Sequence, residues 1–178
     1  MLRLFTALAV PFDIAETLKR RQTGLPGARW RPTDHLHITL SFYGEMDERR
    51  ADDLASELER VKGEPLTLNL TGVGSFGEGH RARTIWAGLA AQPALEVLHG
   101  RCKAAGERAG IAMERRTYRP HVTLAYLKPH TDPDRIGAWM AGHNMLKSPD
   151  FQIDRFALYS SVTTPDGGVY TLEREYPL

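Results

Sequence analysis

The sequence predicts an α+β fold in which antiparallel strands are covered by outer helices. Stretches that alternate apolar and polar residues, as strands do, are interleaved along the chain with stretches of helical period. A four-residue pattern occurs twice, as His37-Ile38-Thr39-Leu40 and as His121-Val122-Thr123-Leu124, each time in an alternating stretch. With 42% hydrophobic and 25% charged residues, the 178-residue chain has the composition of a globular protein with one substantial core.

The first half of the chain begins with apolar and small residues that stop at Pro11, as strands often do. This start imitates a signal peptide, but its apolar run is shorter than the roughly 7 to 15 residues that a secretory segment needs. Aspartates, which are good N-caps, precede both helices of this half. The expected elements are a strand at 2–10, a helix from Asp13 to about 22, a loop at 23–27, the first motif strand at 35–42 ending at Gly44, and an amphipathic helix from Asp47 to about 63.

The second half repeats this order. Alternating residues around a glycine-rich turn predict a hairpin, and a later apolar stripe predicts a long helix that Gly110 ends. The expected elements are strands at 66–70 and 83–89 around a turn from Gly72 to Gly79, a helix at 93–109 with Leu95, Leu98, Cys102 and Ala105 on its buried stripe, the second motif strand at 121–127 after Pro120, a helix at 133–141, and strands at 151–159 and 169–174 around a turn at 165–168.

Each half therefore supplies a motif strand, a helix after it, and a pair of strands. We expect a single domain over residues 1–178, made of two intertwined lobes that are related by a pseudo-twofold axis. Such an arrangement brings the two motif strands to one active-site cleft between the lobes.

Charge and cysteine content limit the class of protein. A formal net charge of +1 argues against a broad basic face for long nucleic acid, although a local basic cluster around a small anion fits. The single cysteine, Cys102, cannot form a disulfide within the chain and argues against a cysteine metal site, so we expect a reducing, cytoplasmic location. No stretch reaches the roughly 18 apolar residues of a membrane span, and nothing demands a protein partner or an oligomer.

The motif itself suggests acid and base chemistry. In a strand, residues at i and i+2 share a face, so the His and Thr of each copy point one way and the apolar residues point the other. A lone His on a strand is more often structural, but two in matched motifs can act together, one donating and one accepting a proton near neutral pH. A Thr hydroxyl on the same face can hold an anionic oxygen, which suits phosphodiester chemistry without a covalent nucleophile. Metal binding is the weaker alternative, because no carboxylate, Asp34 included, is placed as a third ligand.

The two motifs resemble those of a known family. The paired motifs are similar to those of the 2H phosphoesterase superfamily, and more closely to the RNA 2′,3′-cyclic phosphodiesterases, also called 2′-5′ RNA ligases. The resemblance runs essentially from end to end. It includes residues 36–44, 83–86, 119–125, 158–161 and 176–178.

The resemblance implies a bilobal fold, no metal or other cofactor, and hydrolysis of a 2′,3′-cyclic phosphate at an RNA end to a 2′-phosphate. It makes His37 the general acid on the leaving 3′ oxygen and His121 the general base for water. Thr39 and Thr123 hold the non-bridging oxygens. Phe42 matches an aromatic that stacks on the terminal base, although a core aromatic at a strand end is an equal interpretation.

Two positions depart from the family pattern. Tyr126 stands two residues after the Leu of the second motif, where the family usually has an Arg that would contact phosphate. We therefore include Tyr126 in the substrate site and expect Arg83, Arg119 or Lys128 to compensate. His35, where the family often has Asn, is a smaller departure and shares the face of His37 if the strand is regular.

The leading hypothesis is a monomeric phosphodiesterase that acts on short RNA or nucleotides with a 2′,3′-cyclic phosphate. Two alternatives stay open. One is a superfamily relative that acts on another cyclic phosphate or on a 2′-5′ linkage, including the reverse ligation. The other is a binding module for RNA ends without turnover.

Overall fold

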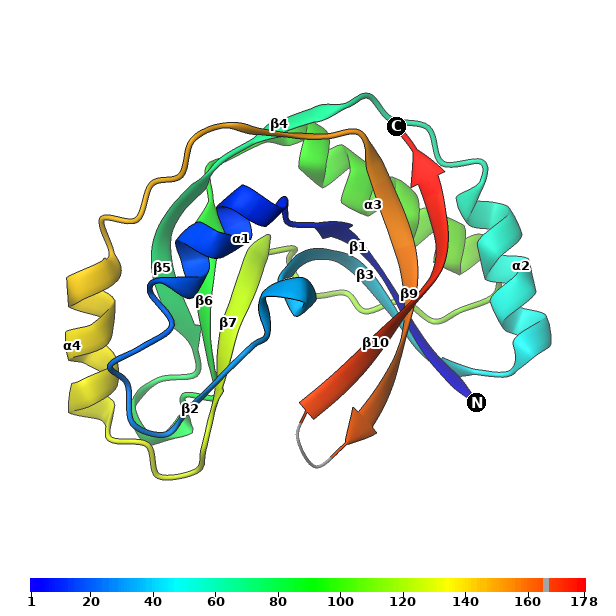
Figure 1. Cartoon of the computed structure of the whole chain (residues 1–178). Helices are drawn as coiled ribbons and strands as arrows, with labels where there is room; N and C mark the ends of the chain where they lie inside the picture. The colour runs from blue at the N-terminus through cyan, green and yellow to red at the C-terminus, as the bar shows by residue number, and fades with distance from the viewer. Residues whose placement is uncertain (165–166) are drawn as a thin grey trace.

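The computed structural model describes residues 1–164 and 167–178, with only the backbone described at residue 167. It confirms the α+β class (Figure 1). The strands are β1 Leu2–Ala9, β2 Ala28–Trp30, β3 His37–Met46, β4 Leu66–Leu68, β5 Leu70–Phe76, β6 Thr84–Leu89, β7 His121–Leu127, β8 Phe151–Ile153, β9 Arg155–Thr164 and β10 Gly167–Pro177. The helices are α1 Phe12–Lys19, α2 Glu48–Leu58, α3 Pro93–Arg108 and α4 Pro133–His143, with 3-10 turns η1 Thr33–His35 and η2 Gly79–Arg81.

Most of the strands form one antiparallel sheet, in the spatial order β10, β9, β1, β3, β7, β6, β5. β2 also pairs with β7, while β4 and β8 form a separate two-stranded ribbon. In Figure 1, β5 and β6 lie in the left half of an arch and β9 and β10 in the right half, with the motif strands β3 and β7 between them. The two motif strands are thus central neighbours in the sheet.

The contact between β3 and β7 is a narrow seam. Their register contains one pair, Ile38 opposite Val122, which are the second residues of the two motifs. Beyond this pair β3 leaves β7, and two carbonyls of β3 are bonded by side chains instead: the Tyr118 hydroxyl donates to the carbonyl of Thr39 at 2.9 Å, and Nδ1 of His99 donates to that of Leu40 at 2.6 Å. Equivalent residues face each other across antiparallel strands, as a local twofold axis requires. The division into two lobes over the whole chain stays a prediction.

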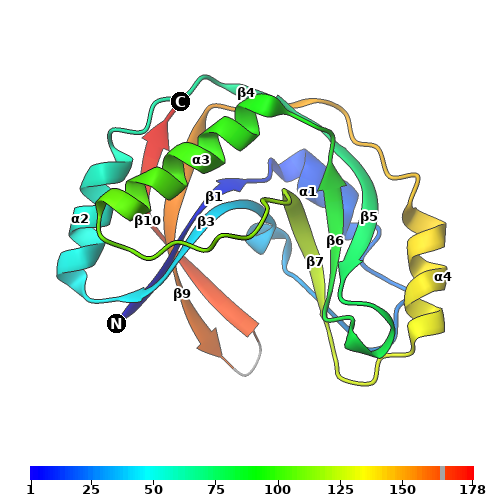
Figure 2. The same cartoon turned by 180° about the vertical axis from the view of Figure 1, so that it is seen from behind.

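Helices cover the two halves of the sheet separately. α2 and α3 pack on the half with β1 and β3, as the view from behind shows (Figure 2), and α4 lies beside β5. The predicted stripe of α3 is confirmed, because its four residues are at most 2% exposed, and Gly110 follows the helix with a positive φ of 76°. None of the helices in the described part of the chain is long and apolar enough to cross a membrane.

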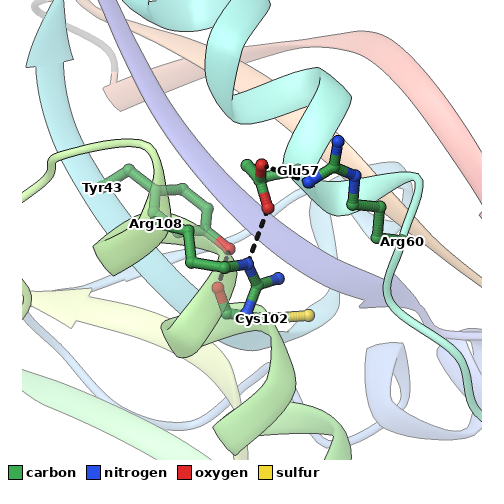
Figure 3. A network of polar contacts seen from close by, with 5 residues as sticks. All are labelled: Tyr43, Glu57, Arg60, Cys102 and Arg108. Atoms are coloured by element: carbon green, nitrogen blue, oxygen red, sulfur yellow. Dashed lines mark hydrogen bonds and ion pairs between the residues drawn. The ribbon is translucent and has the colours of Figure 1, made fainter.

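A polar network ties α2 to α3 (Figure 3). The Glu57 carboxylate accepts from Nε of Arg108 at 2.6 Å and from Nη1 of Arg60 at 2.9 Å, and the bond from Arg108 lowers the pKa of Glu57. Beneath it, the buried Tyr43 hydroxyl donates to the carbonyl of Cys102 at 3.1 Å, which joins β3 to α3. The strand that carries the first motif is therefore fixed from the helical side.

The two motif strands contain the same irregularity. In β3, Thr39 lies opposite Ala7 and Ser41 opposite Thr6, so Leu40 is an extra residue. In β7, Thr123 lies opposite Trp86 and Ala125 opposite Ile85, so Leu124 is extra. Each motif therefore ends in a bulge at its Leu, and a bulge changes which face the following side chains occupy.

Several expected boundaries are wrong. α1 begins at Phe12 after Pro11, whose φ of −57° suits a helix start, so Asp13 lies within the first turn rather than at the N-cap. His35 belongs to η1 and not to the strand, which starts at His37 and continues through Gly44 to Met46. Asp47 does cap its helix, accepting from the backbone N–H of Arg50 at 2.9 Å.

The strand pairing of the middle and end of the chain also differs. The expected turn from Gly72 to Gly79 is mostly strand β5, which forms the hairpin with β6, while residues 66–68 pair with β8. The strand expected at 151–159 is divided at Asp154 into β8 and β9, and β2 was not expected. Of the turn expected at 165–168, residues 165 and 166 lie outside the described residues, and the other two belong to β10.

Candidate active site

The two motif histidines begin the two central strands. His37 is the first residue of β3 and His121 the first of β7. Both are half-buried on the same side as the Thr of their motif, whereas Ile38 and Val122 are fully buried on the other side. The predicted division of each motif into a chemical face and an apolar face is confirmed.

Both rings are held in the same way. Nδ1 of His37 lies 2.7 Å from the carbonyl of His35, and Nδ1 of His121 lies 2.7 Å from the carbonyl of Arg119. A carbonyl can only accept, so Nδ1 carries the hydrogen in each ring and Nε2 keeps a free lone pair when the ring is neutral. Each His can therefore accept or donate a proton at Nε2.

Burial keeps both rings uncharged in the free protein. The pKa of His37 is lowered to about 4, chiefly by burial and also by the positive charge of Arg31 and the neighbouring His121 and His35, against the bond to the His35 carbonyl. Burial also lowers the pKa of His121, which its bond to the Arg119 carbonyl partly offsets. An anion between the rings would favour the charged form of either one.

The surroundings of the two rings are different. The ring of His37 lies 5.2 Å from that of Phe5 and 5.2 Å from that of Tyr170, at the β1 and β10 side. The ring of His121 meets Phe76 edge-on at 4.8 Å and lies 6.2 Å from Trp86. The Trp86 indole lies across Gly74, where a Cβ would come within 2.3 Å of it, so this wall depends on a residue without a side chain.

Each threonine lies across the seam from the histidine of the other motif. Thr39 and Thr123 are half-buried on the open face. Because Ile38 faces Val122 in an antiparallel pair, Thr39 lies on the side of His121 and Thr123 on the side of His37. The two hydroxyls and two imidazoles thus lie on one face around the Ile38–Val122 pair, an arrangement that suits the oxygens of a phosphate group.

The bulges place two aromatic residues in equivalent positions. In a regular strand Phe42 would share the face of Leu40, but after the bulge it is 56% exposed on the side of Thr39. Tyr126, at the same distance after its motif, is half-buried rather than buried like Ala125 and Leu127. Both residues were predicted for the site from the sequence, and the bulges are the reason they reach the open face.

A cavity of about 520 Å³ adjoins the seam. Four residues proposed from the sequence line it, together with the aromatic rings of Phe76, Tyr118 and His99. The four are Thr39, Phe42, Arg119 and His121. Aromatic walls with a few cations are typical of sites for a nucleobase and its phosphate.

Of the two arginines expected to compensate for Tyr126, Arg119 lines the cavity and Arg83 does not. The Arg83 guanidinium donates to the carbonyls of His80 and Ala82, at 3.1 Å each, in its own turn. The cation in contact with Tyr126 is Arg31, whose guanidinium carbon lies 5.3 Å from the ring centre. No pattern in the sequence singles out Arg31, since an arginine in a connecting stretch usually lies in solvent.

No three His, Cys, Asp or Glu side chains of residues 1–164 and 167–178 gather as a metal site. The site as described consists of two imidazoles, two hydroxyls, aromatic walls and arginines.

Comparisons with known proteins give one family. A family model described as the 2′-5′ RNA ligase superfamily matches residues 10–165. The chain is 30% identical over 165 residues to the RNA 2′,3′-cyclic phosphodiesterase of Thermotoga maritima, covering 89% of this chain and 82% of the relative. It is 26% identical over 180 residues to that of Methanocaldococcus jannaschii, covering 98% and 100%.

Solved structures agree in fold. The crystal structure of a protein from Thermus thermophilus has a TM-score of 0.80 and 26% identity, and the match covers 99% of this chain and 97% of that one. The crystal structure of Escherichia coli LigT in complex with 3′-AMP has a TM-score of 0.78, and the match covers 99% of this chain and 98% of that one. At 24% identity this second likeness shows the fold alone.

Proposed function

The chain belongs to the 2′-5′ RNA ligase superfamily, and we propose that it is a metal-independent RNA 2′,3′-cyclic phosphodiesterase that opens the cyclic phosphate at an RNA end to a 2′-phosphate. The family membership predicted from the paired motifs is thereby confirmed. The activity is supported by the relatives of that name and by the chemistry of the two motifs.

One observation carries the proposal. The single pair between β3 and β7 brings the two motifs together at equivalent residues, and each His presents a free Nε2 because its Nδ1 is bonded to a carbonyl. Two such imidazoles can act on opposite sides of one phosphorus atom. The two imidazoles are therefore sufficient as the general acid and the general base of the hydrolysis.

The proton transfers balance within the site. His121 removes a proton from water as its oxygen bonds to phosphorus, and His37 gives a proton to the 3′ oxygen as the bond from phosphorus to that oxygen breaks. The products are a 2′-phosphate and a 3′-hydroxyl. The rings end with exchanged protonation states, which solvent restores before the next turnover.

The other residues hold the substrate. Thr39 and Thr123 donate to the non-bridging oxygens. Phe42 stacks on the terminal base, an interaction worth about 1–3 kcal/mol for an aromatic and a base, and Tyr126 and Arg119 contact the rest of the nucleotide. We place this enzyme in the cytoplasm as a monomer that acts on short RNA or nucleotides.

The test is hydrolysis of 2′,3′-cyclic AMP and of a short RNA with a cyclic phosphate end, with products separated by chromatography. We expect 2′-phosphate products in the presence of chelator. Replacing either His37 or His121 by Ala should lower kcat by roughly 10² to 10⁴, the usual contribution of a general acid or base. His80→Ala, at an exposed His in η2, is the matched control and should keep wild-type activity.

Other outcomes separate the alternatives. Full activity in His37→Ala or His121→Ala would contradict the mechanism, and loss of activity with chelator would favour a metal. A 5′-hydroxyl in place of water would give a 2′-5′ linkage by the same proton transfers, so joined RNA indicates ligation. Binding without turnover of any cyclic phosphate would indicate a binding module.

A further inference from the structure

Arg31 is a buried arginine beside the second motif strand. It follows β2, and its backbone N–H donates to the carbonyl of Leu124, the bulge residue of β7, at 2.8 Å. Its side chain is only 6% exposed. Buried arginines are rare unless they are paired or bind an anion.

The guanidinium is held between two tyrosines. Its carbon lies 5.3 Å from the ring centre of Tyr126 and 5.5 Å from that of Tyr170. Nη2 donates to Nδ1 of His35 at 3.0 Å and to the carbonyl of Gly168 at 3.1 Å. These contacts fix the plane and position of the charge, as a preformed anion site needs.

None of these contacts neutralises the charge. Among the described residues, no carboxylate forms an ion pair with Arg31. An arginine has five N–H groups; the two on Nη2 have acceptors and the Tyr170 hydroxyl also bonds the guanidinium, which leaves N–H groups that can donate to an anion. A buried cation without an acidic partner is costly, and an anionic ligand would offset that cost.

His35 connects this charge to the first catalytic ring. Its imidazole accepts from Arg31, and its carbonyl accepts from Nδ1 of His37. The Tyr170 ring contacts His35 and His37 as well, at 5.1 and 5.2 Å. Arg31 is also near enough to lower the pKa of His37. The cation therefore lies beside the first motif, in a hollow of about 260 Å³ that it lines with His35, Tyr126 and Gly168.

We propose that Arg31 binds the substrate phosphate through its free N–H groups, with Tyr126 and Tyr170 fixing its guanidinium. This inference rests on the proposed function and adds a residue to its site. Arg31 would take a non-bridging oxygen on the side of His37. It thus provides the cation that position 126 lacks.

The first test measures binding of inorganic phosphate and of 2′-AMP by calorimetry, together with kcat/KM on 2′,3′-cyclic AMP. Arg31→Gln should weaken phosphate binding and lower kcat/KM by about 10- to 100-fold, the size of a charge-assisted hydrogen bond. Arg31→Lys keeps the charge but lacks the planar guanidinium. Its phosphate affinity and kcat/KM should lie between those of the wild type and of Arg31→Gln. Arg20→Gln, at an exposed arginine after α1, makes the same charge change and should leave both values unchanged.

A folding control keeps the test decisive. Among the described residues no acidic partner is left behind by Arg31→Gln, so we expect this variant to fold, and its thermal unfolding is measured beside the wild type. A folded Arg31→Gln variant with wild-type phosphate affinity and kcat/KM would overturn the inference while leaving the proposed function intact. Conversely, a wild-type protein that hydrolyses no cyclic phosphate but binds phosphate through Arg31 would overturn the function and retain the anion site.

A second-site variant tests the position of the charge. Because the guanidinium lies over the Tyr126 ring, Tyr126→Arg in the Arg31→Gln background puts a cation close to the same place. We expect the double variant to bind phosphate at least about 5-fold more tightly than Arg31→Gln, because the new arginine can form one charge-assisted hydrogen bond to the anion. No recovery would contradict a phosphate at this position.

Discussion

At the scale of the residue, the two histidines have the same hydrogen bond but different electrostatic surroundings. His37 is more deeply buried and has Arg31 nearby, whereas His121 is bordered by Phe76 and Trp86. Both are neutral at pH 7 in the free protein, yet general acid catalysis needs one of them protonated. The negative charge of the bound phosphate would supply the missing stabilisation of the imidazolium.

The pH dependence should reveal this difference between the free and the bound protein. Since burial lowers both pKa values below 6.5, the protonated acid becomes more abundant as pH falls, so kcat/KM should be maximal below about pH 6.5. The maximum of kcat should lie at higher pH, because the bound phosphate raises the pKa of the ring that donates.

The measurement is the initial rate of 2′,3′-cyclic AMP hydrolysis over a range of pH and substrate concentration. In Arg31→Gln the maximum of kcat/KM should move to higher pH, since the charge that lowers the pKa of His37 is removed. A maximum of kcat/KM well above pH 7 in the wild type would contradict the role of burial.

The residues of the site could be predicted only where the pattern is local. The His and Thr of both motifs follow from strand alternation, and both faces are as expected. Phe42 and Tyr126 reach the open face through bulges that strand alternation does not encode. Arg31 was missed because its burial comes from Tyr170 and Gly168 of β10, far away in the sequence.

At the scale of the element, the hairpin of β5 and β6 builds the wall behind His121. The sequence predicted a hairpin here but placed its first strand too early, because the glycines of β5 are typical of a turn. In the structure Gly74 lies within β5, and its lack of a side chain leaves room for the Trp86 indole on the sheet. This is a packing requirement between strands and is invisible in either strand alone.

Gly74→Val should therefore push Trp86 away from His121. We expect a loss of about 1–3 kcal/mol in the free energy of unfolding, as for other overpacked sites, and a lower kcat because the ring of His121 loses its support. Denaturant unfolding and steady-state kinetics measure the two effects.

Gly100→Ala, in α3 and with no neighbour within 4 Å of the new Cβ, is the control. It should stabilise the protein by about 0.5–1 kcal/mol, as Ala does in a helix, without changing kcat. Unchanged kcat in Gly74→Val would show that the indole does not position His121.

At the scale of the whole molecule, the halves of the sheet meet at one pair of residues. Past Ile38, side chains of α3 and of the segment before β7 replace the strand ladder on β3. Local patterns within each half of the sequence are enough to predict the motif strands and most helices. The pairing of β4 with β8 joins segments that the sequence assigned to different hairpins, and only tertiary contacts decide it.

A ligand bound at this seam should stabilise the fold. By mass action, 2′-AMP at about 100 times its Kd should raise the free energy of unfolding by about 2.7 kcal/mol. Adenosine, which lacks the phosphate, should give a much smaller increase. Thermal unfolding with each compound is the measurement, and equal shifts from both would place the binding energy in the base rather than the phosphate.

The repeated bulge at Leu40 and Leu124 has a consequence for regiochemistry. It makes the two motifs nearly interchangeable, so a cyclic phosphate could lie between them in either of two opposite directions, and each direction would release a different ribose oxygen. The motifs alone cannot choose between the 2′ and the 3′ product. That choice belongs to the unlike residues that follow the bulges, an exposed aromatic at Phe42 that contacts Phe5 and an arginine-bound one at Tyr126, so the isomer ratio of the product reports on them directly.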